Sequence, residues 1–195
     1  VMDGIGQVWG SVRDPLPEGR AVNMLKDIGP GESNYNRYDM MIADKACDWL
    51  DDAVNRKDKK PWALYLGFVA PHFPLVVPEE FYNMYPLDSL PPRKLDPEEG
   101  FVQHPWMKRQ NDFAQVDRHL SPERRQMAVA AYFGLCSFVD HQIGRVVDKL
   151  AATGLDENTR IIYTSDHGDN VGARGMWGKS NMYEEAVGIP LIIAG

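Results

Sequence analysis

The stretch of this 195-residue chain whose residue types best suit chemistry is IIYTSDHGDNVGARGMWGKS, residues 161–180. Here a short apolar run ends just before Asp166 and His167, so a carboxylate and an imidazole stand together where a strand would end. Two such groups can bind one cation, because oxygen ligands suit Ca²⁺ or Mg²⁺ and imidazole extends the choice to Mn²⁺ or Zn²⁺. Gly168 permits a sharp bend directly after them. An aspartate that caps a turn, beside a solvent-facing histidine, is the alternative interpretation.

Three further side chains are candidates for binding an anion. Lys179 closes the stretch, and lysine is a point-charge donor for a sulfate or phosphate oxygen; Arg174 could act in the same way. His72 stands between Pro71 and Pro74, and a histidine held in one direction can donate to an anionic oxygen or act as an acid or base. The alternatives are two solvated loop cations and a loop histidine with no chemical role.

Composition excludes several other classes of protein. The net charge of −7 argues against a nucleic-acid-binding surface, which requires a basic patch. No apolar run approaches the roughly 20 residues that span a bilayer. The glycines of residues 161–180 match neither a P-loop nor a dinucleotide fingerprint. Cys47 and Cys136 lie in amphipathic helical patterns, which favours two buried free thiols over a disulfide.

The elements that must position these side chains follow from periodicity. Apolar residues recur at helical spacing over residues 37–55 and again over residues 122–152. Ser121 and Pro122 suit the start of the second helix, as N-cap and first helical residue. Three short apolar runs predict strands, the first of them buried on both faces as in a parallel sheet. These runs are residues 62–70, 160–165 and 189–195.

The remaining segments are predicted to be irregular or nearly so. Residues 1–35 read as loop, and the prolines of residues 71–78 argue against regular structure there. Residues 79–86 predict a short helix, and residues 87–120 predict a long surface loop.

The order of these elements predicts an α/β protein with a largely parallel sheet flanked by helices. Such sheets bind ligands beyond the carboxyl ends of their strands. If the strands are parallel, His72 and the pair formed by Asp166 and His167 lie on the same rim.

Three stretches of the chain, in this order, resemble the sulfatase family of the alkaline-phosphatase superfamily. They are KPWALYLGFVAPHFPLVVPEEF, AAYFGLCSFVDHQIGRVVDKLAATGLDENTRIIYTSDHG and TSDHGDNVGARGMWGKSNMYEEAVGIPLI. The likeness runs from about residue 35 to the end, apart from residues 87–120. The D-H-G form and the W-G-K-S-x-M-Y-E-E continuation are similar to choline-sulfatase-like, arylsulfatase-like or phosphonate-monoester-hydrolase-like bacterial members.

The resemblance implies roles for individual residues. Asp166 and His167 match two metal ligands of the family, whose cation is most often Ca²⁺, with Mn²⁺ in the phosphonate hydrolase branch and Mg²⁺ also possible. His72 and Lys179 match catalytic residues that contact the sulfate ester, and Arg174 would assist them in substrate binding. The implied activity is hydrolysis of a small-molecule sulfate monoester to an alcohol and sulfate.

The nucleophile that the family requires is not found in the chain. That nucleophile is a formylglycine made from the Cys or Ser of a C/S-x-P-x-R motif, and no such motif occurs in residues 1–195. We therefore expect residues 1–195 to be the central part of a sulfatase-like catalytic domain, with the nucleophile and further acidic metal ligands in a preceding N-terminal part. We expect no turnover from this segment alone.

Two other functions fit the same residues. One is a phosphonate monoester or phosphodiester hydrolase of the same superfamily, and the other is a non-catalytic module that binds an anion at the same rim. The sequence leaves the alcohol half of the substrate, the oligomeric state and the compartment open, the bacterial cytoplasm and periplasm being equally consistent with two cysteines.

Overall fold

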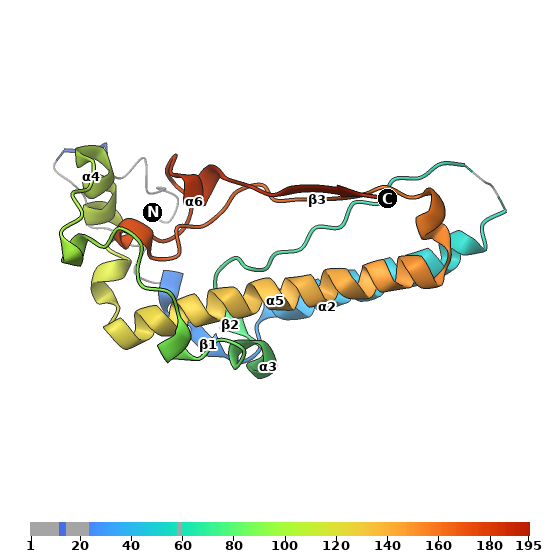
Figure 1. The fold of residues 1–195 in the computed structure, drawn as a ribbon, viewed down its shortest axis with the longest axis horizontal. Helices are drawn as coiled ribbons and strands as arrows, with labels where there is room; N and C mark the ends of the chain where they lie inside the picture. The colour runs from blue at the N-terminus through green and yellow to red at the C-terminus, as the bar shows by residue number, and fades with distance from the viewer. Residues whose placement is uncertain (1–11, 15–23, 58–59) are drawn as a thin grey trace.

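Two long helices organise the molecule, in a computed structural model that describes residues 12–14, 24–57 and 60–195. Helices α2 (Asn34–Val54) and α5 (Pro122–Ala152) run side by side along the long axis (Figure 1). The hydroxyls of Ser33 and Ser121 cap them, accepting N–H groups at 3.1 and 3.2 Å. Both predicted helices are confirmed, and the second begins and ends where the sequence indicated.

The strands form two separate pairs among the described residues. Strands β1 (Ile28–Pro30) and β2 (Leu75–Val77) are parallel, whereas β3 (Ile161–Thr164) and β4 (Leu191–Ala194) are antiparallel. The α/β class is therefore confirmed, but only one of these two pairs is parallel. The predicted strands over residues 160–165 and 189–195 correspond to β3 and β4.

Two predictions about strands are wrong. Residues 62–70 form no strand, because no other described strand pairs with them, and Tyr65 is 91% exposed. Conversely, β1 and β2 lie in segments predicted to be irregular. Pro74 and Pro78 flank β2 without entering it, so the N–H groups of the three paired residues stay available to the ladder.

Residues 87–120 are more ordered than a surface loop. They contain helix α4 (Pro105–Ala114) and three 3₁₀ turns, and they bury Phe113, Val116 and Leu120. The short helix predicted for residues 79–86 is present as α3 (Glu79–Tyr82).

The core lies where α5 covers β2 and α3, beneath the long helices in Figure 1. Leu75, Leu135 and Phe138 are 1% exposed, and the rings of Phe81 and Phe138 meet edge to face with centroids 5.6 Å apart. Trp177 belongs to the same cluster. The core therefore reaches the loop that follows β3 and anchors one of its residues.

Candidate functional site

The end of β3 brings together three of the predicted side chains. Asp166 and His167 follow the strand directly, and Asp166 Oδ2 lies 3.4 Å from His167 Nε2. The Nζ atom of Lys179, twelve residues further on, contacts the same imidazole nitrogen. The side chain of Asp166 is 84% exposed and that of His167 30%, so the cluster is open to a ligand.

The hydrogen bonds of His167 fix which ring nitrogen carries the proton. Its Nδ1 atom lies 2.8 Å from the carbonyl oxygen of Gly168. A carbonyl oxygen can only accept, so Nδ1 donates and Nε2 of the neutral ring presents a lone pair. The ammonium of Lys179 points its charge at that lone pair. A metal ion would require the same lone pair, so Lys179 and a cation compete for His167.

Gly168 allows the backbone to approach helix α6 (Glu184–Val187) at this point. The N–H of Gly168 donates to the carbonyl oxygen of Ala186 at 2.8 Å. A Cβ atom at position 168 would lie 2.1 Å from the carbonyl oxygen of Glu185, which no side chain tolerates. Position 168 must therefore be glycine for Asp166 and His167 to sit beside α6.

Asp169 and Asn170 tie the exit of β3 to the loop that carries Lys179. Asp169 Oδ1 accepts two backbone N–H groups, one of them from Gly178 at 3.1 Å. Asn170 donates both its backbone N–H and its side-chain amide to the carbonyl oxygen of Gly178, at 2.9 and 2.5 Å. Gly178, the residue before Lys179, is thus held through both its N–H and its carbonyl group.

His72 is not brought into direct contact with the cluster in the described part of the chain. Its N–H closes a turn onto the carbonyl oxygen of Val69 at 3.0 Å, and its Nδ1 atom lies 2.9 Å from the carbonyl oxygen of Phe73. Its ring meets those of Tyr35 and Phe73 edge to face. The predicted place of His72 on the same rim as Asp166 and His167 therefore stays a prediction.

Asp39 is a site-shaping residue that the sequence interpretation missed. This fully buried carboxylate accepts the N–H groups of Val69 and Ala70, each at 2.8 Å, and so holds the turn that presents His72. Burial raises the pKa of Asp39, and the two N–H groups oppose that shift. The available signal was an acid on the same face of α2 as Ala43 and Ala46, the face that is buried.

The side chain of Arg174 contacts Glu185 and Tyr183 rather than the cluster at the end of β3. Its guanidinium forms an ion pair with Glu185 at 2.6 Å and lies 4.0 Å from the ring centroid of Tyr183. The residue is 9% exposed. Although burial raises the pKa of Glu185, hydrogen bonds from Lys94 and Arg174 lower it to about 2. Arg174 thus holds α6 against the loop, and its contact with a substrate stays a prediction.

Asp166 and His167 could provide two ligands of a cation site, and no further ligand is placed beside them among the described residues. Two ligands about 2.4 Å from Ca²⁺ and about at right angles would lie about 3.4 Å apart. Asp166 Oδ2 and His167 Nε2 have that separation. Within residues 12–14, 24–57 and 60–195, no group of three or more His, Cys, Asp or Glu side chains is placed to hold a metal. Because Ca²⁺ takes 6–8 oxygen ligands, the other donors must come from outside the described residues or from solvent.

Neither cysteine is suited to act as a nucleophile. Both are free thiols, as predicted, but they are only partly buried. Burial raises the pKa of Cys136 to about 11 and also raises that of Cys47. A thiol must ionise to attack, so the raised pKa values disfavour both as nucleophiles at neutral pH.

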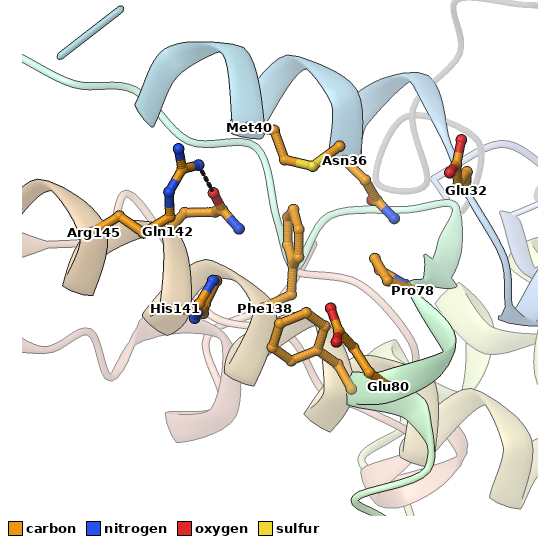
Figure 2. A pocket seen from close by; sticks show the side chains of 10 residues that line it. Glu32, Asn36, Met40, Pro78, Glu80, Phe138, His141, Gln142 and Arg145 are labelled. Atoms are coloured by element: carbon orange, nitrogen blue, oxygen red, sulfur yellow. Dashed lines mark hydrogen bonds between the residues drawn. The ribbon is translucent and has the colours of Figure 1, made fainter. Parts of the chain in front are cut away.

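A cavity of about 350 Å³ lies apart from this cluster, between α2, α3 and α5. Figure 2 shows Met40 and Phe138 on its apolar side, with Arg145 donating to Gln142 at 2.8 Å at one end. None of the predicted site residues lines this cavity. The chemistry suggested by the sequence therefore belongs to the end of β3.

The fold and the site define an α/β protein with a carboxylate, an imidazole and an ammonium gathered at a strand end. The sulfatase family model matches residues 12–195, so the chain belongs to the sulfatase family. In the part of the chain that the structure describes, no helix is long and apolar enough to cross a membrane.

Known relatives and structures agree with this assignment. A sulfatase of Formosa agariphila is 31% identical over 99% of this chain and 41% of its own length. A choline-sulfatase of Rhizobium meliloti is 32% identical over 84% of this chain and 33% of its own. The crystal structure of a phosphonate monoester hydrolase from Agrobacterium radiobacter shares the fold, with a TM-score of 0.68 at 24% identity over 89% of this chain and 38% of that one. The chain thus spans less than half the length of these proteins.

Proposed function

We propose that residues 1–195 are the central part of the catalytic domain of a metal-dependent sulfatase that hydrolyses a sulfate monoester to an alcohol and sulfate. The observation that carries this proposal is the convergence of Asp166, His167 and Lys179 at the end of β3 in a chain of this family. The catalytic sheet of the complete domain would be largely parallel.

In this proposal Asp166 and His167 are two of the metal ligands. The neutral imidazole of His167 presents the lone pair of Nε2, and the exposed carboxylate of Asp166 lies 3.4 Å from it. A bound divalent cation, Ca²⁺ by family resemblance, would supply Lewis-acid stabilisation of the charge that develops on the sulfate oxygens. Two protein ligands hold such an ion weakly, so we expect the 195-residue protein to bind Ca²⁺ with a Kd above about 1 mM.

Lys179 and His72 act on the sulfate group. The ammonium of Lys179 is a point charge for a sulfate oxygen, which gains negative charge as the ester bond breaks. The imidazole of His72 can donate to the ester and protonate the departing alcohol oxygen. Arg174 would add to the positive field at the site. The nucleophile, a formylglycine hydrate, would come from outside residues 1–195.

The test uses the complete reading frame that contains residues 1–195, expressed with the machinery that makes formylglycine. We expect turnover of an aryl sulfate, lost in Asp166→Asn and reduced at least about 100-fold in kcat/KM in Lys179→Ala. Lys108→Ala is the matched control, because Lys108 is an exposed cation paired with Asp112 and its loss should change kcat/KM less than 2-fold.

Two results would reject the proposal. One is a kcat/KM for an aryl phosphonate monoester above that for the aryl sulfate, which would assign the phosphonate hydrolase alternative. The other is turnover of an aryl sulfate by residues 1–195 alone, since this segment contains no formylglycine motif.

A further inference from the structure

The backbone around Lys179 is fixed on both sides although the side chain is free to reach a ligand. Trp177, two residues before it, is 4% exposed and belongs to the core. Gly178 is held by Asp169 and Asn170 as described. On the other side, the amide nitrogen of Gln110, itself 1% exposed, donates to the carbonyl oxygen of Ser180 at 2.5 Å. The path of the backbone at Lys179 is thus set by its neighbours.

Asp117, in the segment 87–120, contacts Trp177 and two arginine side chains at once. Its Oδ1 atom accepts the indole N–H of Trp177 at 3.0 Å. Its Oδ2 atom pairs with Arg93 at 2.6 Å and with Arg125 at 3.1 Å. The side chain is 14% exposed, and those of the two arginines are 16% and 19% exposed. One largely buried carboxylate therefore joins α5, the segment after α3 and the loop that carries Lys179.

Residues 93–111 make further contacts with the same loop, mostly to backbone atoms. Arg93 Nε donates to the carbonyl oxygen of Gly172 at 3.0 Å. Arg174 receives two contacts: its N–H donates to the carbonyl oxygen of Lys94 at 3.0 Å, and its carbonyl oxygen accepts from Gln103 at 2.5 Å. Backbone contacts do not depend on the loop's side chains, so they fix its path.

We propose that Asp117 is a positioning residue for Lys179, acting through Trp177. The catalytic role of Lys179 in this inference rests on the proposed function, whereas its positioning by Asp117 is inferred from these hydrogen bonds and ion pairs alone. Asp117 contacts neither Lys179 nor the ligand space. Its carboxylate fixes the rotation of the Trp177 ring, which fixes the backbone at Gly178 and the direction in which Lys179 leaves it.

This network explains a feature of the sequence that the proposed function leaves aside. Residues 87–120 carry many charges in a segment predicted to lie in solvent, yet two of these charged side chains, Arg93 and Asp117, are largely buried against the loop. Burying a carboxylate between two guanidinium groups and an indole N–H is favourable only when every partner is held in place. Such a cluster suits a rigid support better than a solvated loop.

A double-mutant cycle in the complete enzyme tests the proposal. Asp117→Asn should lower kcat/KM for an aryl sulfate about 10- to 100-fold, because a misplaced charge stabilises the transition state less. In the Lys179→Ala background the same change should cost less than about 3-fold, since the group that it positions is absent. Trp177→Phe removes the indole N–H together with part of the ring and leaves both arginines paired with Asp117, so it carries the test if Asp117→Asn does not fold.

Asp112→Asn is the matched control. Asp112 lies in the same segment and pairs with Lys108 at 2.7 Å and Arg118 at 2.8 Å, but these partners lie outside the loop. Its loss should change kcat/KM less than 2-fold in both backgrounds. Equal losses from Asp117→Asn with and without Lys179 would show a purely structural role and overturn the proposal.

A second measurement separates this proposal from the proposed function. In the 195-residue protein with ¹³C-dimethylated lysines, the Lys179 signal, identified by its absence in Lys179→Ala, should differ from that of a free surface lysine. Asp117→Asn or Trp177→Phe should move it toward the free value, and Asp112→Asn should not. An unchanged Lys179 signal in Asp117→Asn and Trp177→Phe overturns the positioning role, whereas absence of sulfatase turnover with the expected shifts rejects only the proposed function.

Discussion

Strands are usually buried and loops exposed, but strands β3 and β4 and the loop that joins them show the reverse. The strands are apolar and exposed, with Ile162 at 65% and Ile193 at 63%. The middle of the loop, residues 170–178, is rich in glycine and polar residues and is mostly buried, with Met176 and Trp177 at 4% and Arg174 at 9%. Apolar character therefore does not decide burial in this part of the chain.

The difference comes from the partners that each region has. The loop is covered by residues 93–117, whose side chains satisfy its backbone groups and surround Trp177. The two strands are hydrogen-bonded to one another, and no other described strand extends their sheet. A polar loop with satisfied backbone groups can thus be a firmer platform for Lys179 than the strand that precedes it.

The largest expected effect is at the junction of the two regions. Gly168→Ala places a Cβ atom 2.1 Å from the carbonyl oxygen of Glu185, and because this contact is with backbone, α6 must shift to accommodate it. We expect the free energy of unfolding of the 195-residue protein to fall by about 2–3 kcal/mol, measured by urea denaturation. The change should also separate α6 from the cluster at Asp166.

The same substitution in α5 is the control. A Cβ atom at Gly144 meets nothing within 4 Å, so Gly144→Ala should raise the free energy of unfolding by about 0.5–1 kcal/mol through helix propensity. Equal effects at the two glycines would mean that the approach of Gly168 to α6 does not occur in solution.

A smaller effect is expected inside the loop, and it depends on pH. Hydrogen bonds from Lys94 and Arg174 lower the pKa of Glu185 to about 2 from an ordinary value of 4.5, against the effect of burial. A lowered pKa stabilises the folded state above pH 4.5, and this contribution is lost as the pH falls from 4.5 toward 2. Glu185→Gln should therefore cost about 1–2 kcal/mol at pH 7, and its difference from wild type should shrink steadily below pH 4.5.

Glu184→Gln is the neighbouring control for this measurement. Glu184 lies on the exposed side of the same short helix, and its substitution should change the free energy of unfolding by less than about 0.5 kcal/mol at either pH. A pH-independent cost of Glu185→Gln would contradict the ion pair with Arg174 and attribute the loss to packing.

Local signals in the sequence were sufficient for the helices and for singling out Asp166, His167 and Lys179 as candidate site residues. Helix α5 was predictable because Ser121 and Pro122 encode its start and apolar spacing continues to its end. The three candidates could be singled out because residue types and their place after an apolar run are properties of one short stretch. No long-range pairing had to be known.

The supporting residues could not be predicted, since their roles depend on contacts far along the chain. Asp117 is 60 residues from Trp177, and Asp39 is 30 residues from Val69. Charged residues in a proline-rich segment favour a solvated loop on composition alone, so residues 87–120 were misjudged. The strand prediction for residues 62–70 was wrong for the reverse reason. Their composition is typical of a strand, but a strand also needs a neighbouring strand with which to pair.

The smallest expected effect concerns the strands themselves. Ile162 and Ile193 face each other in the antiparallel register of β3 and β4, and both are mostly exposed. Ile162→Thr keeps a β-branched residue in the strand and removes apolar surface, so we expect a change below about 0.5 kcal/mol in the free energy of unfolding. Leu135→Ala in the core, where the side chain is 1% exposed, should cost about 2–5 kcal/mol in the same urea denaturation assay. A loss from Ile162→Thr approaching that of Leu135→Ala would show that β3 is covered in solution, and the contrast between an exposed strand and a buried loop would no longer hold.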